Sequence, residues 1–221
     1  MRERQAVCIR EGMRRRRSSL RVTVFSAALV LGLASGAAQT TSDTKTMQIL
    51  NDGIAKAWQL TSEGYDLMGG RPSLASDKPI IRDQIPAAKQ KFLDSEKVLD
   101  GAEPTDKYPH DKFAKIYTHA DYVRASNLYG LGMIKLLEGD TSGSERNVFR
   151  SLELAEGSFK ASLELMNEPA WADNARNCAS LLVELHGLSA VIAGAKGNKD
   201  SQAEHERRLK ELVAWMKANP R

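Results

Sequence analysis

The sequence predicts an all-α protein of about six helices arranged as three antiparallel hairpins. Apolar residues recur at spacings of three and four along six segments after about residue 43, which is the period of an α-helix. No segment alternates apolar and polar residues in the β-branched pattern typical of a strand. The breaks between the segments are mostly short and carry glycine or proline, which favours antiparallel packing of consecutive helices.

The first 37 residues have the layout of a secretory signal peptide. A basic stretch with four arginines at 14–17 precedes the apolar run Val22–Ala38, which ends in small residues. The alternative is a retained membrane anchor, but about 17 residues diluted by serine and glycine are marginal for spanning a bilayer. We therefore expect the signal (1–37) to be removed, leaving one all-α domain over 38–221 in the periplasm or outside the cell.

The export route is suggested by the residues beside the arginines. The segment RRSSLR (16–21) partly resembles a twin-arginine signal, yet Ser19 stands where an apolar residue is expected, so general secretion is favoured. The first 37 residues also hold eight of the 32 basic and two of the 28 acidic residues, which leaves 24 basic against 26 acidic. The mature chain therefore offers no basic surface for nucleic acid, and its expected contact with a membrane is limited to the export signal.

The six helical segments are bounded by turn-forming residues. They are expected over about 44–68, 83–101, 111–138, 144–166, 169–195 and 200–217. Gly69, Gly101 and Gly139 follow the first three as C-terminal caps, while Pro86 and Pro169 open the second and fifth where a missing N–H costs little. The three hairpins would then run over about 43–100, 109–166 and 168–217.

One face of each segment is apolar and is expected to form the core. Typical positions are Leu50, Ile54 and Ala57 in the first helix, Ala88, Phe92 and Leu99 in the second, Ile116, Val123 and Ile134 in the third, Val148, Leu152 and Ala155 in the fourth, Cys178, Leu181 and Leu185 in the fifth, and Leu209, Leu212 and Met216 in the sixth. The fifth segment is the least polar, so we expect it to be central. Ser201–Glu204 fits a capping box, which predicts the start of the sixth helix.

The second hairpin resembles a tetratricopeptide repeat. The matching residues are Leu131, Gly132 and Gly139 in the first helix, and Ala155, Phe159, Ser162 and Pro169 in or after the second. In such repeats small residues let two helix backbones approach, and the aromatic ring fills the gap beside them. The resemblance implies a right-handed array of hairpins that serves as a binding scaffold, with an irregular helical bundle as the alternative.

The hairpin also departs from that repeat. Ala155 follows Gly132 by 23 residues where the repeat has twelve, and Lys135 stands at a tyrosine position. The match covers one hairpin of three, so a relative of this family would be an elongated one. Exported subunits associated with tripartite transporters have a similar appearance, which makes a transporter-associated subunit an alternative function.

Reactive side chains form no recognisable catalytic or metal motif in the sequence. The four histidines are scattered at His110, His119, His186 and His205. Cys178 lies on an apolar helix face, where a thiol is inert. We expect no cofactor and no enzymatic activity. The alternative is a helical-bundle enzyme or metal-binding protein that uses His119, Asp121 and His186.

Recognition by surface aromatic residues is the remaining class of function. Trp58, Tyr117, Tyr122, Tyr129 and Trp171 are the candidate ligand-binding residues. Aromatic side chains on a helical surface often anchor ligands or peptides, although each could instead fill the core. The sequence therefore predicts a non-catalytic binding or scaffold protein whose partner is a protein, a peptide or a small ligand.

Overall fold

A computed structural model describes residues 41–72, 79–102 and 113–220 of the chain, and within these ranges every regular element is helical. The predicted signal peptide lies outside the described residues. The helices are α2 (Thr41–Leu67), α3 (Ile85–Gly101), α4 (Ala114–Leu137), α5 (Thr141–Glu164), α6 (Pro169–Ala195) and α7 (Lys199–Ala218), with a short 3-10 turn η1 (Arg82–Gln84) before α3. The predicted all-α class and the six expected helices are confirmed.

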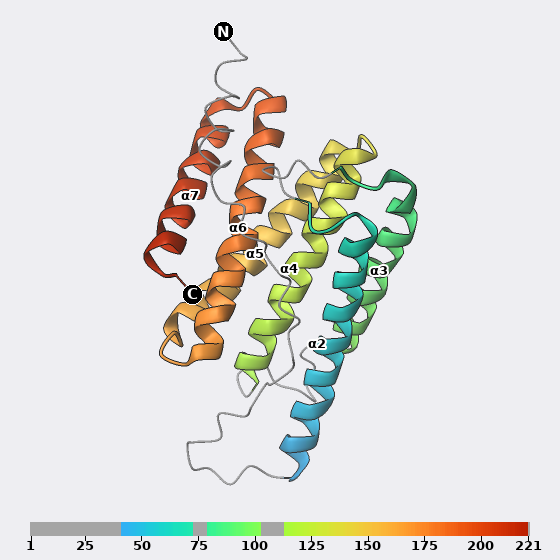
Figure 1. The fold of residues 1–221 in the computed structure, drawn as a ribbon, viewed down its shortest axis with the longest axis vertical. Coiled ribbons are helices and arrows are strands. Elements are labelled where there is room, and N and C mark those ends of the chain that lie inside the picture. The colour runs from blue at the N-terminus through green and yellow to red at the C-terminus, as the bar shows by residue number, and fades with distance from the viewer. Residues whose placement is uncertain (1–40, 73–78, 103–112, 221) are drawn as a thin grey trace.

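Consecutive helices pack as antiparallel pairs, α2 with α3, α4 with α5 and α6 with α7. The first two pairs meet where α4 packs on α2 and α3, and the second and third meet where α5 packs on α6. Seen as in Figure 1, α2, α4 and α6 lie in front of α3 and α5. The three hairpins are those that the sequence predicts.

The α4–α5 hairpin is closely packed because small residues line its contact. A Cβ atom added to Gly132 would lie 3.0 Å from Val148 Cγ2, so only a glycine fits comfortably there. Nearby, the Ser151 hydroxyl donates to the Ala125 carbonyl oxygen at 2.6 Å. The close approach of these two helices, expected from Gly132, is confirmed.

The turn between α4 and α5 combines a glycine cap with an aspartate cap. Gly139 has φ +83°, a left-handed conformation that ends α4 as predicted. Asp140 then caps α5, since its Oδ1 accepts a hydrogen bond from the Gly143 amide at 2.8 Å. Helix α5 therefore begins at Thr141, three residues before the predicted start at Ser144.

Helix α7 also begins earlier than predicted. The Asn198 side chain caps it by accepting from the Ser201 amide at 3.1 Å, and the helix starts at Lys199. The expected capping box at Ser201–Glu204 is wrong, because the N-cap is Asn198 and Ser201 already lies within the first turn of the helix. No residue of α7 is fully buried; its inner face, which includes Leu212 and Trp215, is half-buried.

The composition of α6 predicts a central helix, but the central helix is α4, which packs against α2, α3 and α5, whereas α6 packs mainly against its neighbours along the chain. It packs against α5 on one side and α7 on the other, and its buried residues include Leu181, Leu185 and Leu188. Among the described helices it alone is long and apolar enough to cross a membrane by composition. A core helix passes the same test, and these leucines pack in the protein core.

Phe92 of α3 joins the first two hairpins. Its ring is fully buried between Gly64 of α2 and Gly130 of α4. A Cβ atom at Gly64 would lie 2.8 Å from the ring, and one at Gly130 would lie 2.6 Å from it, so both positions are closed to any larger residue. Tyr65 packs edge-on against the same ring, with centroids 5.0 Å apart.

The substitution Gly130→Ala is expected to destabilise the protein. The new methyl group would overlap the Phe92 ring, and overpacking costs about 1–3 kcal/mol, more than the 0.5–1 kcal/mol or so that alanine gains in a helix. Gly157→Ala is the matched control, because Gly157 is exposed in α5 and a Cβ there meets nothing within 4 Å. Denaturant unfolding should show a lower free energy of unfolding for Gly130→Ala and a slightly higher one for Gly157→Ala. A higher value for both variants would contradict the close packing of Gly130 on Phe92.

Candidate functional site

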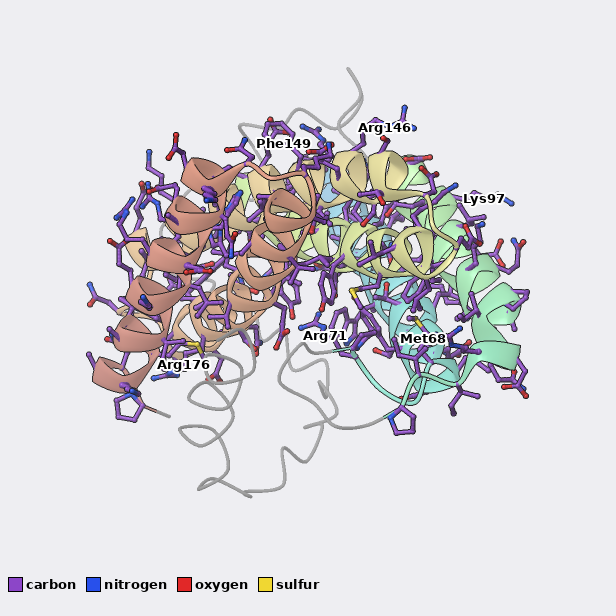
Figure 2. The ribbon with its side chains drawn as sticks, turned by 90° about the horizontal axis from the view of Figure 1, so that it is seen from above. Met68, Arg71, Lys97, Arg146, Phe149 and Arg176 are labelled. Atoms are coloured by element: carbon purple, nitrogen blue, oxygen red, sulfur yellow. The ribbon has the colours of Figure 1, made fainter. Side chains whose placement is uncertain are left out.

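Arg71 lies just beyond α2, where two glycines redirect the chain. Gly69 (φ +90°) and Gly70 (φ +114°) end the helix, and the Gly70 amide donates to the Tyr65 carbonyl oxygen at 2.8 Å. Figure 2 shows Arg71 on the opposite side of the molecule from Phe149, which belongs to α5. The turn thus brings a long cationic side chain back against the middle of α4.

Tyrosine and serine side chains surround the Arg71 guanidinium. One guanidinium nitrogen, Nη2, donates to the Ser126 hydroxyl, and the guanidinium carbon lies 5.2 Å from the centroid of the Tyr65 ring. Tyr122 lies beside the same guanidinium. The Tyr65 hydroxyl in turn donates to the Ser126 carbonyl oxygen, so this cation is fixed against α4 by neutral groups.

The charge of Arg71 is not balanced by an ion pair within the described part of the chain. A guanidinium remains protonated at any physiological pH. Burial raises the pKa of Tyr65, and burial followed by the charge of Glu184 raises the pKa of Tyr129, so both hydroxyls stay neutral. The cluster therefore offers a fixed positive charge among neutral hydroxyl groups.

The structure gathers three of the five predicted ligand-binding residues near Arg71. Tyr122 contacts the guanidinium, the rings of Trp58 and Tyr122 lie 5.6 Å apart, and the Tyr129 hydroxyl donates to the carbonyl oxygen of Pro72, the residue after Arg71. Of these three, only Trp58 is more than slightly exposed.

The other two predicted residues lie apart from Arg71's contacts. Tyr117 is buried nearer the start of α4. Trp171 is buried and stacks on His119 with centroids 4.8 Å apart, and the Lys115 ammonium lies 6.0 Å from the Trp171 centroid. Contact of any of the five with a ligand stays a prediction.

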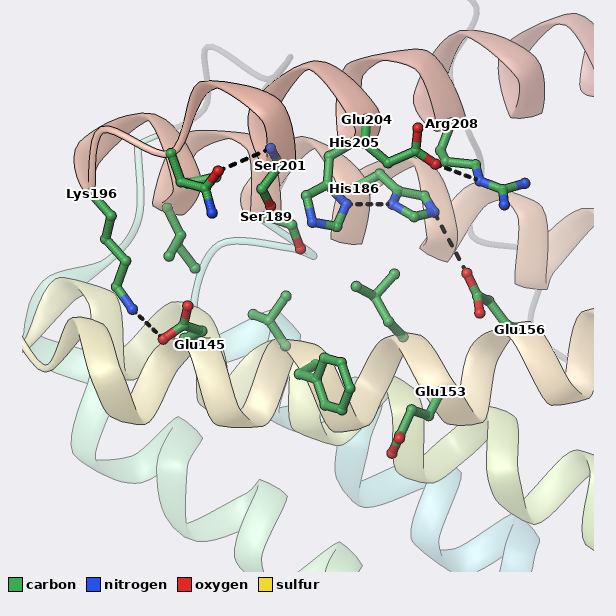
Figure 3. A pocket seen from close by; sticks show the side chains of 16 residues that line it. Glu145, Glu153, Glu156, His186, Ser189, Lys196, Ser201, Glu204, His205 and Arg208 are labelled. Carbon is green, nitrogen blue, oxygen red and sulfur yellow. Dashed lines mark hydrogen bonds and ion pairs between the residues drawn. The ribbon is translucent and has the colours of Figure 1, made fainter.

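A second feature is a cavity of about 540 Å³ between α5, α6 and α7. Figure 3 shows the side chains that line it. Its apolar lining comes from residues such as Val148, Leu152 and Ile192. Its charged lining consists of the carboxylates of Glu145, Glu153, Glu156 and Glu204 and the cations of Lys196 and Arg208. Acidic groups outnumber basic ones four to two, so the cavity carries a net negative charge.

Two histidines face each other at this cavity. Nδ1 of His186 lies 3.0 Å from Nδ1 of His205, and Nε2 of His186 lies 3.9 Å from a carboxylate oxygen of Glu156. Burial lowers the pKa of His186 to about 4, and the charge of Arg208, together with that of His205 when it is protonated in acid, acts in the same direction. Burial also lowers the pKa of His205, so both imidazoles are neutral at neutral pH.

The alternative metal set of His119, Asp121 and His186 is not assembled in the structure. His119 stacks on Trp171, whereas His186 pairs with His205. Across the described residues no group of three or more histidine, cysteine, aspartate or glutamate side chains could hold a metal ion.

Two residues of these sites escaped the sequence reasoning. Arg71 lies in a loop and belongs to no periodic pattern. The only feature of the sequence that could have indicated it is its position directly after the two glycines that end the first helix. His205 was treated as a scattered histidine. Its spacing of 19 residues from His186, across a short helical turn, is the feature that could have indicated that they face each other.

Cys178 is buried at the α5–α6 contact and is not activated. Burial raises the pKa of its thiol to about 12, although the Ser158 hydroxyl 3.2 Å away acts in the opposite direction. A thiol that is almost wholly protonated is a poor nucleophile. The prediction that Cys178 is an inert core residue agrees with this environment.

A thiol reagent should modify Cys178 only after unfolding. In a Cys8→Ala background, we expect native protein at pH 8 to react at least about a hundredfold more slowly than urea-unfolded protein, because the native thiol is both protonated and buried. The measurement is the rate of release of a coloured thiol product. Rapid stoichiometric labelling of the folded chain would show that Cys178 is accessible and ionised.

Similarity to known proteins does not help to interpret the two sites. No protein family, curated protein or solved structure matches the chain. The tetratricopeptide resemblance accordingly stays a prediction that depends on the residues of the second hairpin. What the protein does has to be inferred from Arg71 and its neighbours, and from the cavity at α7.

Proposed function

We propose that this chain is an exported, non-catalytic binding protein that recognises an anionic group through Arg71. The observation that carries the proposal is a guanidinium held by Ser126, Tyr65 and Tyr122 with no carboxylate paired to it among the described residues. Bringing a cation into a half-buried position costs solvation free energy, and an incoming anion would offset that cost.

The geometry of arginine suits a carboxylate or a phosphate. The planar guanidinium presents five N–H donors, and two of them can bind both oxygens of one anionic group. Ser126 uses the Nη2 position, which leaves other donors of Arg71 for a ligand. The nearby ring of Trp58, which packs on Tyr122, supplies aromatic surface for the uncharged part of that ligand.

The ligand class that fits is an acid with an apolar or aromatic body. A small organic acid and the terminal carboxylate of a peptide or protein partner share this chemistry. The scaffold suits such a role, because three hairpins in series present their first helices, α2, α4 and α6, on one side of the molecule. The resemblance to tetratricopeptide repeats supports the same class of function.

Binding is favoured over catalysis by the state of the reactive groups. The Cys178 thiol is protonated and buried. His119 packs on Trp171, and His186 pairs with His205, so neither is paired with a nucleophile in the described structure. The predicted export signal supports a location in the periplasm or outside the cell.

Arg71→Gln should weaken anion binding. A panel of small carboxylates and phosphates, with the corresponding amides as neutral analogues, is tested for raising the melting temperature, and the best ligand is then titrated by calorimetry. We expect at least a roughly tenfold weaker affinity for Arg71→Gln, because hydrogen bonds to a charged group contribute about 1.5–3 kcal/mol. The affinity of Arg71→Lys should lie between those of the wild type and Arg71→Gln, since lysine keeps the charge but lacks the planar guanidinium.

Arg146→Gln is the control for nonspecific charge effects. Arg146 is an exposed arginine of α5 on the opposite face, as Figure 2 shows, so its loss should leave the affinity unchanged. Circular dichroism must first show that each variant is folded, since Arg71 also bonds Ser126. Equal affinity of wild type and Arg71→Gln, or no anion that stabilises the wild type, would refute the proposed site.

Export predicts a defined mature N-terminus. The small residues at 35–38 fit a cleavage site, so the protein recovered from the periplasm or medium should begin at Ala38 or Gln39. Mass spectrometry of the intact exported protein measures this directly. A chain that retains Val22–Ala38 and sediments with membranes would instead identify that run as an anchor.

A further inference from the structure

We propose that His186 and His205 form a binding site for a divalent transition-metal ion of the copper or nickel class. The site lies at the cavity between α5, α6 and α7, away from Arg71, and does not depend on the proposed anion binding. The two imidazoles face each other there, one from α6 and one from α7.

The separation of the two nitrogens fits a shared metal ion. With metal–nitrogen bonds of about 2.0–2.1 Å, an Nδ1–Nδ1 distance of 3.0 Å corresponds to an angle of about 90–97° at the metal. Adjacent positions of square-planar or tetragonal coordination have this angle, which Cu²⁺ and Ni²⁺ prefer with nitrogen and oxygen ligands. Two neutral imidazoles can provide the required lone pairs once the proton between them is displaced.

Glu156 supports the coordinating form of His186. Its carboxylate lies 3.9 Å from His186 Nε2, which is too far for a direct hydrogen bond, but its negative charge on that side favours the tautomer with the proton on Nε2. The lone pair of Nδ1 then points toward His205. A carboxylate behind the outer nitrogen of a histidine is the usual arrangement around metal ligands, because it orients the ring and increases its basicity.

The surroundings of the pair suit a cation with open coordination positions. Four carboxylates and two cationic side chains line the cavity, so its net charge attracts a positive ion. The described residues provide no third histidine, cysteine or carboxylate donor for the same ion. Water or a ligand in the cavity of about 540 Å³ would complete the coordination, which makes the site exchangeable rather than structural.

The test uses the full chain purified without a polyhistidine tag and titrated with Ni²⁺ and Cu²⁺. We expect one equivalent to bind, and the electron paramagnetic resonance spectrum of the Cu²⁺ complex to show coupling to imidazole nitrogen. His205→Gln should weaken binding at least tenfold; it is the better variant because His205 is half-exposed on α7 and its loss spares the core. Glu156→Gln should weaken binding by about tenfold as an indirect effect.

His119→Gln is the matched control. It removes one histidine that stacks on Trp171 and has no contact with the cavity, so nonspecific binding to histidines would fall equally in both variants. Metal should also raise the melting temperature of wild type and of His119→Gln, and not that of His205→Gln. Unchanged affinity in folded His205→Gln, equal losses in both histidine variants, or a copper spectrum without nitrogen coupling would overturn the proposal.

Discussion

The wedge formed by Phe92 is the contact on which the arrangement of the first two hairpins depends. Its ring occupies a space that exists only because Gly64 and Gly130 lack side chains. The ring therefore sets the distances at which α2 and α4 pack against α3. A buried polar network lies in the same interface, where Asn127 bonds Thr61, Ser95 and Glu96 at 2.6–2.8 Å. Because Tyr65 touches Phe92 and also packs on Arg71, the rigid interface extends to the guanidinium.

The third hairpin is attached by a different kind of contact. Helix α6 meets α5 through small and polar side chains, among them Ser158 with Cys178 and Asn174 with Ser162. Helix α7 then packs on α6 through half-buried residues, and the cavity remains beside them. The two candidate sites therefore differ in character: Arg71 is fixed against a tightly packed pair of hairpins, whereas the histidine pair joins α6 to α7, a helix in which no residue is fully buried.

Helix periodicity was sufficient to predict the class, the six helices and their pairing, since the apolar face visible in each helix's sequence packs inward, fully buried in α2 to α6 and half-buried in α7. The bounds of α6 are those expected because a proline and an apolar run define it locally. The starts of α5 and α7 lie earlier than the periodicity predicts, because the side chains of Asp140 and Asn198 cap these helices and carry no apolar signal. The sites were the least predictable part. Arg71 acquires its neighbours from α4, and His186 acquires His205 from α7, so their roles arise from packing that no single helix encodes.

The absence of any fully buried residue in α7 has a consequence for how the molecule opens. Lifting α7 from α6 would expose half-buried groups such as Leu212 and Trp215 but would leave the Phe92 interface intact. Such a partial opening needs far less free energy than global unfolding, so backbone amides of α7 should exchange with solvent well before those of α4. Any ligand that binds α6 and α7 together would stabilise their contact. The first sign of its binding would be slower exchange of the backbone amides of α7.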